Sequence, residues 1–585
     1  MDNAKLEKKL NSRLRKRFGG SVKASVEDRI IRVTGNLLEW EDIIRACSMC
    51  VVKKDGFHVV NDITFEGATV PEMRVPDIGD DALDGARPDV LIIGGGISGA
   101  SIARELTRWK IDVLLVDKEA DLAVQASGRN DGEVHPGVDL GKGTLKQKYV
   151  VRGNRMFDKL CDDLDVPFKR CGQYAGFTEW FTLPVVWLYG LQRKYICGVD
   201  DTRIVFGKKI RRGEPGLNHD FKFALYNPMA GCVCPYGLTI AFGENAAANG
   251  AGISLNTAVT AMEVRDGRII SVDTNRGRIY PKMVINAAGV FAEDVAAMAE
   301  DRFVSIHPRR GTNSITDKKK GTMVGCISSV KTLKKNRSHT KGGGILHTVH
   351  DNLLVGPNAV ETWEKENFAT EKDSIDKVFE KQKMTAPKLD ERDIITYFTG
   401  VRPATFEEDF VIEKGRNTAN LIHCAGIQSP GLTTAPAVAV DVAEMTVEQL
   451  KKCDPQMEIK KNPDFNPRRK GIISVKDLPE EERDRLIKEN PDYGVIVCRC
   501  EEISKGEILD ALRSGLCVPT LDGIKRRLRP GMGRCQGGFC SPLVMEIIAD
   551  YLGVPLSEVR KNGPLSYMTL GSTKDLQSAV TSQDK

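Results

Sequence analysis

The chain has 585 residues, more than one hydrophobic core usually serves, so two or three folded units are expected. Hydrophobic residues (41%) and charged residues (28%) are in ordinary globular proportion. The net charge of +5 is too small to favour nucleic acid as a partner. Apolar runs such as Val90–Ile93 are strand-sized, and Met1–Lys5 begins no signal peptide. We therefore expect a cytoplasmic protein with no membrane span.

Fifteen cysteines are many for a cytoplasmic protein, and an odd number fits poorly with a disulfide framework. In a reducing compartment the thiols serve either as small buried residues or as metal ligands. Cys47 and Cys50 form a C-x2-C pair on an expected helix with no second pair nearby, which leaves open core packing or a site shared with a partner.

Residues 1–65 predict a small α+β module. A basic helix comes first, followed by a strand at 29–33, a helix at 39–49 and a strand at 57–60. Val33-Thr34-Gly35, together with Gly56–Ile63, resembles the BON-type interaction domain over some forty residues. Residues 66–87 are acidic, contain Gly and Pro and show no apolar period, which predicts a linker.

Residues 88–465 alternate strand and helix signals and predict an α/β unit with a dinucleotide site. The apolar strand 90–93 runs into Gly94-Gly95-Gly96-Ile97-Ser98-Gly99, and a helix follows. Gly94 permits a tight turn, Gly96 lets the backbone approach a diphosphate, and Gly99 lets helix and strand pack closely. A second strand, 113–116, ends at Asp117, where an acidic side chain holds a ribose hydroxyl.

The glycine turn alone does not separate FAD from NAD, but later motifs do. They are Gly143-Thr144-Leu145-Lys146, Pro308-Arg309-Arg310-Gly311, Leu354-Val355-Gly356-Pro357, Gly400-Val401-Arg402-Pro403 and Ser429-Pro430-Gly431-Leu432. With them, residues 88–450 resemble the two-domain FAD-dependent oxidoreductases of the D-amino-acid oxidase superfamily. The branch they resemble contains anaerobic glycerol-3-phosphate dehydrogenase and L-2-hydroxyglutarate oxidase.

The resemblance implies a Rossmann-like FAD-binding fold beside an antiparallel substrate sheet. It also implies flavin contacts along the chain, with Val259 at the adenine end and 426–433 beneath the pyrimidine ring. A helix starting there would stabilise negative charge on reduced flavin. The implied FAD residues are Gly94, Gly96, Ser98, Gly99, Asp117, Lys118, Ser127, Asn130, Val259, Gly289, Gly426, Gly431, Leu432 and Thr433.

Enzymes of this type take a hydrogen from a carbon that bears a hydroxyl or an amine, so the protein must anchor an anionic group and accept a proton. Arg402 is the expected anchor, with a structural pairing to Glu407 or Glu408 as the alternative. His135 matches a histidine beside the flavin and is a candidate base, although it could also cap a turn. Arg310 is a second candidate anchor. Gly132-Glu133 and Thr312-Asn313 depart from the pattern of the branch at positions where a substrate would be read.

Residues 490–560 predict a compact metal-binding unit, followed by a polar tail at 561–585. Its cysteines form the pattern C-x-C…C-x4-C, and glycines around the second pair would free backbone amides for sulfur. The four predicted ligands are Cys498, Cys500, Cys535 and Cys540. The unit resembles the small α-helical bacterioferritin-associated-ferredoxin type of [2Fe–2S] domain; zinc is the rival, although its sites more often show C-x2-C pairs.

The sequence therefore predicts an FAD-dependent dehydrogenase of a small anionic alcohol, a 2-hydroxy acid or glycerol 3-phosphate. Electrons would leave through a [2Fe–2S] cluster to a second flavoprotein or another acceptor subunit. Two alternatives stay open. One is an amine or amino-acid dehydrogenase of the sarcosine, proline or opine type. The other is an electron-relay subunit whose flavin meets no substrate.

Overall fold

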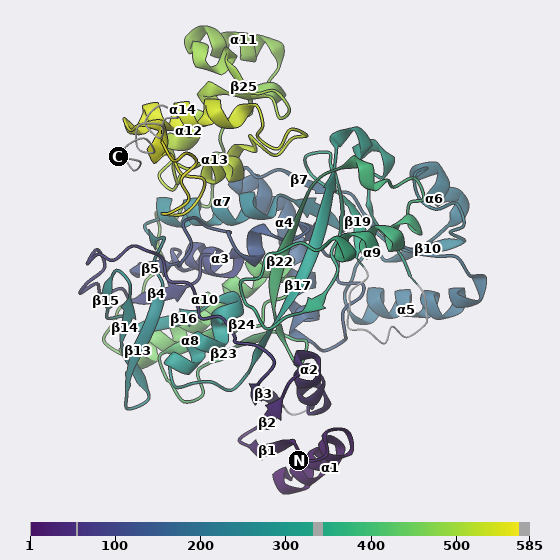
Figure 1. Cartoon of the computed structure of the whole chain (residues 1–585), viewed down its shortest axis with the longest axis vertical. Helices are drawn as coiled ribbons and strands as arrows, with labels where there is room; N and C mark the ends of the chain where they lie inside the picture. Colours follow the sequence, from purple (N-terminus) through teal and green to yellow (C-terminus); the bar gives the residue numbers. More distant parts are fainter. Residues whose placement is uncertain (1, 54–55, 332–342, 572–585) are drawn as a thin grey trace, which may run out of the picture.

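The computed structural model describes residues 2–53, 56–331 and 343–571. A central α/β unit lies between an N-terminal module and a C-terminal cysteine-bearing unit, which occupy opposite ends of the long axis (Figure 1). No described helix is both long enough and apolar enough to span a bilayer. The end of the expected tail, 572–585, lies outside the described residues.

The N-terminal module packs two helices on a small sheet, and its expected elements are present. They are α1 (Asn3–Phe18), β1 (Val22–Glu27), β2 (Ile30–Leu37), α2 (Trp40–Met49) and β3 (His58–Phe65). β1 was not predicted, although its buried and exposed residues alternate as an edge strand requires. Cys47 and Cys50 are fully buried in the core of the module. Their burial favours core packing over a site shared with a partner.

The segment 66–87 forms no helix or strand but is held against the central unit. Leu83 N donates to Arg276 O at 2.8 Å, and Arg74 Nη2 lies 2.7 Å from Glu119 Oε1. The predicted linker is therefore ordered by its contacts. The module before it is also tied down, since Val59 N donates to Glu407 Oε1 at 2.7 Å.

The nucleotide-binding part of the central unit is built on a sheet in the order β12-β5-β4-β16-β24-β23, parallel except at β23. These strands are β4 (Val90–Ile93), β5 (Val113–Val116), β12 (Gly252–Ser254), β16 (Met283–Asn286), β23 (Val411–Lys414) and β24 (Leu421–Ala425). Apolar clusters pack on both faces of the sheet, as expected of covered parallel strands, while Asn286 and His423 are buried polar residues at its strands.

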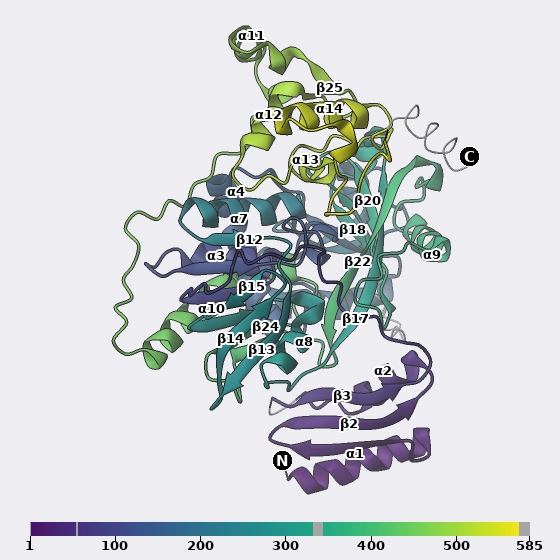
Figure 2. The ribbon, with the colours of Figure 1, turned by 60° about the vertical axis from the view of Figure 1, so that its left-hand side comes forward.

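Helices cover one face of this sheet, and a small sheet with a short helix covers the other (Figure 2). The first set is α3 (Ile97–Leu106), α7 (Pro235–Ala248) and α10 (Gly431–Cys453); α4 (Leu145–Leu164) packs on α10. The second set is β13 (Val259–Arg265), β14 (Arg268–Thr274), β15 (Gly277–Ile279) and α8 (Ala292–Met298). The parallel strands of the main sheet all end at the same edge, where α3 and α10 begin. Ligands bind at this edge in such folds.

The substrate part is a larger sheet in the order β21-β17-β20-β19-β18-β8-β10-β9, with β22 on the other side of β17. Its strands are β8 (Gln173–Phe177), β9 (Arg203–Phe206), β10 (Phe223–Asn227), β17 (Ile306–Thr316), β18 (Ile327–Val330), β19 (Gly344–His347), β20 (Leu353–Gly356), β21 (Val360–Glu361) and β22 (Ile394–Thr405). Around it lie α5 (Leu183–Ile196), α6 (Gly207–Gly213) and α9 (Lys372–Lys383). The expected antiparallel pairing holds except between β18 and β8, which are parallel.

A short ribbon joins the two parts beside α10. It is formed by β6 (Glu133–Val134), β7 (Phe168–Arg170) and β11 (Gly231–Val233) in the order β6-β11-β7. Thr433, in the first turn of α10, accepts a hydrogen bond on Oγ1 from His135 N at 2.9 Å. The ribbon is thereby held at the helix N-terminus.

The C-terminal unit is small and mostly helical. Its elements are α11 (Glu480–Glu489), β25 (Ile496–Cys498), β26 (Ile503–Ser504), α12 (Lys505–Arg513), α13 (Leu521–Leu528) and α14 (Cys540–Leu552). The unit docks on α7 through α13. Arg527 Nη1 lies 2.8 Å from Asp121 Oδ2, and both side chains are buried. The basic run 525–529 is therefore largely an interface between units, and not the solvated face that charge runs usually form.

Candidate active site

The glycine turn after β4 is formed as its sequence predicts. Gly94 has a φ of +115°, and a Cβ there would lie 2.4 Å from Ala287 O. A Cβ on Gly99 would lie 1.8 Å from Gly94 O, so any side chain would push α3 off the strand. Gly96 is the N-cap of α3 and has no side chain to cap the helix; Ile97 N, the first amide, donates to Ser127 Oγ at 2.8 Å, and the positive end of the helix faces the cavity.

A cavity of about 130 Å³ opens at this turn. Asp117 lines it, and its carboxylate accepts hydrogen bonds from Gly95 N and, at 2.7 Å, from Glu119 N. Burial raises the pKa of Asp117 to about 6, so the carboxylate is ionised at neutral pH. Most of the residues expected to bind FAD line this cavity: Gly94, Gly96, Ser98, Asp117, Lys118, Ser127, Val259 and Gly289.

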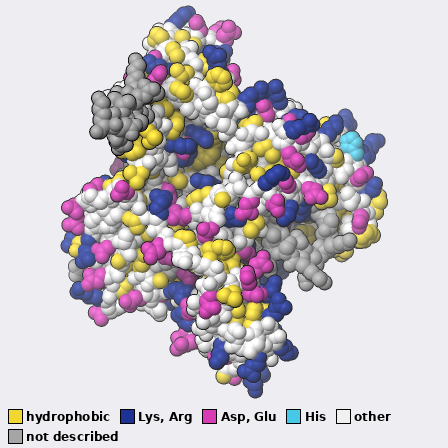
Figure 3. Space-filling model, in the orientation of Figure 1, with side chains coloured by type: hydrophobic (Ala, Val, Ile, Leu, Met, Phe, Trp, Pro, Cys, Tyr) yellow, Lys and Arg dark blue, Asp and Glu magenta, His cyan; other side chains and the backbone are white. Residues whose placement is uncertain are grey.

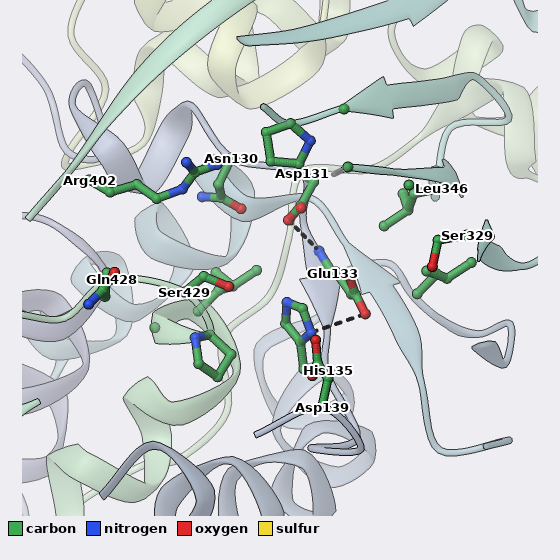
Figure 4. A pocket seen from close by; sticks show the side chains of 18 of the residues that line it. Asn130, Asp131, Glu133, His135, Asp139, Ser329, Leu346, Arg402, Gln428 and Ser429 are labelled. Carbon is green, nitrogen blue, oxygen red and sulfur yellow. Dashed lines mark hydrogen bonds and ion pairs between the residues drawn. The ribbon is translucent and has the colours of Figure 1, made fainter. Parts of the chain in front are cut away.

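A second cavity of about 240 Å³ adjoins the first (Figure 4). Ser127, Pro403 and Ile427 line both cavities, so the two form one elongated space. The second contains the expected residues His135, Arg402, Asn130, Gly431 and Leu432. It also contains Glu133 and Gln428, from segments expected at the substrate and the flavin, and four polar residues that sequence reasoning did not assign to the site: Asp131, Asp139, Gln173 and Lys331.

His135 is paired with Glu133 inside this cavity. Its Nδ1 lies 3.1 Å from Glu133 Oε1, and that carboxylate also accepts from Gln173 Nε2 at 3.0 Å. Burial alone would lower the pKa of His135, but the charge and hydrogen bond of Glu133, with Asp139 and Asp131 beyond, raise it above its ordinary value. The pairing leaves Nε2 as the nitrogen that can exchange a proton with a ligand.

Arg402 reaches the cavity from β22, and Figure 4 shows its guanidinium beside Asn130. Among the described residues its only hydrogen bond is Nη1 to Asn358 O at 3.1 Å. Glu408 instead pairs with Arg309 at 2.6 Å, and Glu407 binds the N-terminal module. The structural pairing considered for Arg402 is therefore not formed. Burial lowers the pKa of Arg402, as it does for a cation with no carboxylate partner.

Arg310 lines neither cavity. In the antiparallel pair β17–β22, Arg309 stands opposite Arg402 and Arg310 opposite Val401. Directly opposed residues share a face of the sheet, so Arg310 and Arg402 point to opposite faces. Arg310 pairs with Glu371 at 2.5 Å. The structure gives it no contact with the space in which a substrate anchor would act.

Three expected cofactor residues support the site without lining it. Gly99 packs α3 on β4, Gly426 adopts a φ of +65° before α10, and Thr433 holds His135. Thr312 and Asn313, where the chain departs from the related branch, do not line the cavity either, whereas Glu133 does. The expectation that all these departures lie at the substrate space is correct only for Glu133.

Two features show that the elongated space fits a flavin. α10 begins at Gly431 in the cavity wall, so its free amides face the ligand. Gln428 Nε2 is buried without a hydrogen-bond partner among the described residues and lines the same wall. The elongated space has unpaired hydrogen-bond donors at one end and the dinucleotide turn at the other. These features match a cofactor with polar atoms at both ends.

The four cysteines of the C-terminal unit converge as two pairs. Cys500 Sγ and Cys535 Sγ are 3.7 Å apart, and Cys540 shares a thiol hydrogen bond with Cys498. Two thiol pairs can hold a cluster with two irons, each bound by two sulfurs.

The backbone around the cysteines also fits an iron–sulfur cluster. Amides of Gly531, Glu501 and Cys500 bond to Cys498, and amides of Phe539 and Gly537 bond to Cys535. A Cβ on Gly533 would lie 2.2 Å from Cys500 Cβ. The loop that carries Gly533 can therefore approach the loop of Cys498 and Cys500 because it has no side chain at this position. Cys540 is the first residue of α14, which directs the positive end of that helix at the sulfurs.

Comparison with known proteins identifies the family. The model of the FAD dependent oxidoreductases matches residues 89–445. The chain belongs to this family. The model of the BFD-like [2Fe-2S] binding domain matches residues 496–550, so the second cofactor is a [2Fe–2S] cluster and not zinc. The resemblances inferred from the sequence motifs are confirmed for both units.

Relatives of this oxidoreductase match over most of the chain. Glycerol 3-phosphate dehydrogenase of Caloramator mitchellensis is 38% identical over 83% of this chain and 99% of its own. Glycerol 3-phosphate oxidase of Mycoplasma genitalium is 29% identical, covering 65% and 98%. Among solved structures, FAD-bound L-alpha-glycerophosphate oxidase of Mycoplasma pneumoniae is 24% identical, with a TM-score of 0.59 over 66% of this chain and 98% of its own. That likeness shows the same fold.

Proposed function

We propose that this oxidoreductase is a glycerol-3-phosphate dehydrogenase that passes the electrons of its substrate through FAD and the [2Fe–2S] cluster to a second protein. One observation supports the proposal most: Arg402, which has no carboxylate partner among the described residues, and the Glu133–His135 pair line the same cavity. The first can bind an anionic group and the second can accept a hydroxyl proton. The 38% identical relative supports glycerol 3-phosphate as the substrate.

In this proposal the chain's own side chains bind and deprotonate the alcohol. Arg402 holds the phosphate by charge-assisted hydrogen bonds, and Lys331 adds a second cation at the cavity wall. His135 Nε2 takes the hydroxyl proton, and Glu133 holds the ring through Nδ1–H and stabilises the imidazolium. FAD, when bound, supplies the acceptor for the hydrogen of the substrate carbon and for its electron pair.

The cysteine unit is placed to receive those electrons. Asn130, Asp131 and Leu346 line both the substrate cavity and a further cavity, which Met532 and Gln536 of the cysteine unit also line. Gln536 adjoins the ligand Cys535. The [2Fe–2S] cluster, when bound, accepts one electron at a time and passes it on.

An acceptor protein is the partner we propose. Two further relatives, from Haloferax volcanii and Haemophilus influenzae, are 25% and 24% identical, and each is named as one subunit of an anaerobic glycerol-3-phosphate dehydrogenase. Beside Cys540, Phe539 is 82% exposed and Leu543 is 44% exposed. An exposed aromatic side chain next to a cluster ligand suits docking of an electron acceptor. A role for the N-terminal module in that contact and a cytoplasmic location stay predictions.

A panel of substrates tests the proposal. Anaerobic holoenzyme is mixed separately with glycerol 3-phosphate, L-2-hydroxyglutarate, glycerol, sarcosine and L-proline, and flavin bleaching is recorded. We expect fast bleaching by glycerol 3-phosphate and none by glycerol, which lacks the anionic group. Bleaching by an amine alone would replace this function with the amine-dehydrogenase alternative. Bleaching by no small molecule would favour a relay subunit.

A further inference from the structure

A third cavity lies where the C-terminal unit meets the oxidoreductase unit. Its volume is about 320 Å³, within the range of small-molecule sites. It shares no lining residue with the dinucleotide cavity and only Asn130, Asp131 and Leu346 with the substrate cavity. Figure 3 shows a hollow in this region, with Lys and Arg side chains on its margin and hydrophobic side chains below.

The wall from the C-terminal unit is cationic. Lys525, Arg526 and Arg529 line it, and Arg129 lines it from the oxidoreductase side. Two carboxylates, Asp131 and Asp522, also face the cavity, and Asp522 is paired with Lys561 at 3.1 Å. Four cations against two carboxylates leave an excess of two positive charges.

Two of these cations lack an acidic partner in the part of the chain that the structure describes. Lys525 Nζ forms no hydrogen bond or ion pair in residues 2–53, 56–331 and 343–571, whereas Arg526 and Arg529 pair with Asp121 and Glu501 at 3.1 Å each. The guanidinium of Arg129 lies over the Phe368 ring at 4.1 Å, and its Nε bonds to Val124 O. Burial and the neighbouring cations lower the pKa of Lys525 and that of Arg129. A buried cation that has no carboxylate beside it is stabilised when an anion binds next to it.

Aromatic side chains also line the cavity. They are Tyr397 and Phe398 of β22, and Tyr236, whose Oη accepts a hydrogen bond from Arg529 Nη1 at 2.9 Å. His350 also lines the cavity, and its Nε2 is buried with no hydrogen-bond partner in the described chain. Burial, with the nearby Arg529, lowers the pKa of His350 to about 2, so its ring is neutral and can exchange a hydrogen bond with a ligand.

We propose that this cavity is a binding site for an aromatic mononucleotide, with the phosphate at Lys525 and Arg129 and the ring system against Tyr397 and Phe398. Phosphate matches the unpaired cations, and the aromatic side chains with the unpartnered His350 imidazole suit a planar heterocycle with polar edges. Inorganic phosphate alone would leave most of the 320 Å³ unfilled. The site is distinct from the FAD site and does not depend on the identity of the oxidised substrate.

The test uses FAD-saturated holoenzyme, so that no probe can enter the dinucleotide cavity. First, purified protein is denatured and the extract is analysed for nucleotides other than FAD. If none is present, AMP and FMN are titrated by equilibrium dialysis. We expect one mononucleotide per chain, either co-purified or bound saturably. Lys525→Gln should weaken binding about tenfold, which corresponds to about 1.4 kcal/mol.

Matched controls separate this site from the substrate cavity. Lys488→Gln removes an exposed lysine of α11 in the same unit and should leave binding unchanged. FAD content and cluster absorbance of each variant report whether it has folded. The proposal is overturned if neither probe binds and the extract holds only FAD, or if Lys525→Gln leaves binding unchanged. Displacement of the probe by saturating glycerol 3-phosphate would also overturn it, because the probe would then occupy the substrate cavity.

Discussion

Glu133 Oε1 and His135 Nδ1 lie 3.1 Å apart at the end of the short strand β6, inside the cavity that Arg402 enters. The carboxylate acts on the imidazole, which faces the substrate space, so Glu133 is a positioning residue for the proposed base. Burial works against the imidazolium while Glu133 stabilises it, and the net effect is a raised pKa of His135.

Glu133→Gln should shift the acidic limb of the pH profile. Removing the carboxylate charge lowers the pKa of His135, so the neutral base persists to lower pH and the limb moves in the acid direction by about one unit. The maximal rate should fall, because the base is weaker and less well oriented. The anaerobic rate of flavin reduction against pH measures both effects. A limb that stays in place would show that His135 is not the titrating group.

Arg402→Gln should raise KM for the anionic substrate and lower kcat/KM by roughly 30-fold to 1000-fold, as expected when a charge-assisted anchor worth about 2–4 kcal/mol is lost. Arg310→Gln, on the opposite face of the sheet, is the matched control and should change kcat/KM little. Steady-state kinetics of the two variants check this. Equal losses in both would refute the assignment of Arg402 as the anchor.

Gly311→Ala should impair Arg402 without touching its charge. A Cβ at Gly311 would lie 2.3 Å from Arg402 Nη2, so the guanidinium must move. We expect a higher KM with an unchanged FAD content. Unaltered KM would mean that the position of this guanidinium does not matter for binding.

Asp121→Ala should loosen the C-terminal unit. The Asp121 and Arg527 side chains are 0% and 2% exposed, and removal of one partner leaves a buried uncompensated charge that costs about 3–5 kcal/mol. We expect faster proteolytic release of the unit and slower reduction of the cluster by substrate, while flavin bleaching persists. Asp484→Ala, at an exposed pair on α11, should have no such effect.

Docking of the N-terminal module should weaken at alkaline pH. His58 lies 3.5 Å from Glu413 and 3.9 Å from Glu407; burial opposes its charge, but the two carboxylates raise its pKa to about 9. Because the folded pKa exceeds the unfolded one, this stabilisation is complete below about pH 6.5 and is lost as pH rises through about 9.

Hydrogen exchange of the Val59 and Asn61 amides measures this docking, since both donate to the central unit. After correction for the intrinsic rate, protection should fall by roughly 10-fold to 100-fold between neutral pH and about pH 10. In His58→Gln it should be lower at neutral pH and nearly independent of pH. A fall of equal size in that variant would assign the effect to another group.

The features that could be predicted from the sequence are those that a few neighbouring residues determine. The glycine turn at Gly94–Gly99 and the C-x-C and C-x4-C cysteine pairs are each defined by residues that are close in the sequence. The structure forms the turn and brings the cysteines together as expected. Glu133 was singled out because the chain departs there from the related branch, and the structure places it in the cavity beside His135.

What the sequence could not supply depends on register and docking. Arg310 and Arg402 both lie in motifs that match the related branch. Only the pairing of β17 with β22 shows that their side chains point to opposite faces of the sheet. The basic run 525–529 could not be assigned to an interface, because its partner Asp121 lies some 400 positions earlier (405 from Arg526, 406 from Arg527). The third cavity likewise exists only where the two units meet.

The most direct test of the electron path is anaerobic reduction of the wild type and of Cys535→Ser by glycerol 3-phosphate, with optical and EPR detection in parallel. In the wild type the flavin should bleach first and the EPR signal of a reduced [2Fe–2S] cluster should follow. Cys535→Ser should retain flavin bleaching and lose the signal, whereas Cys517→Ser, at a half-buried thiol outside the group of four, should behave as wild type. A wild-type flavin that bleaches fully while the cluster stays oxidised would contradict the account.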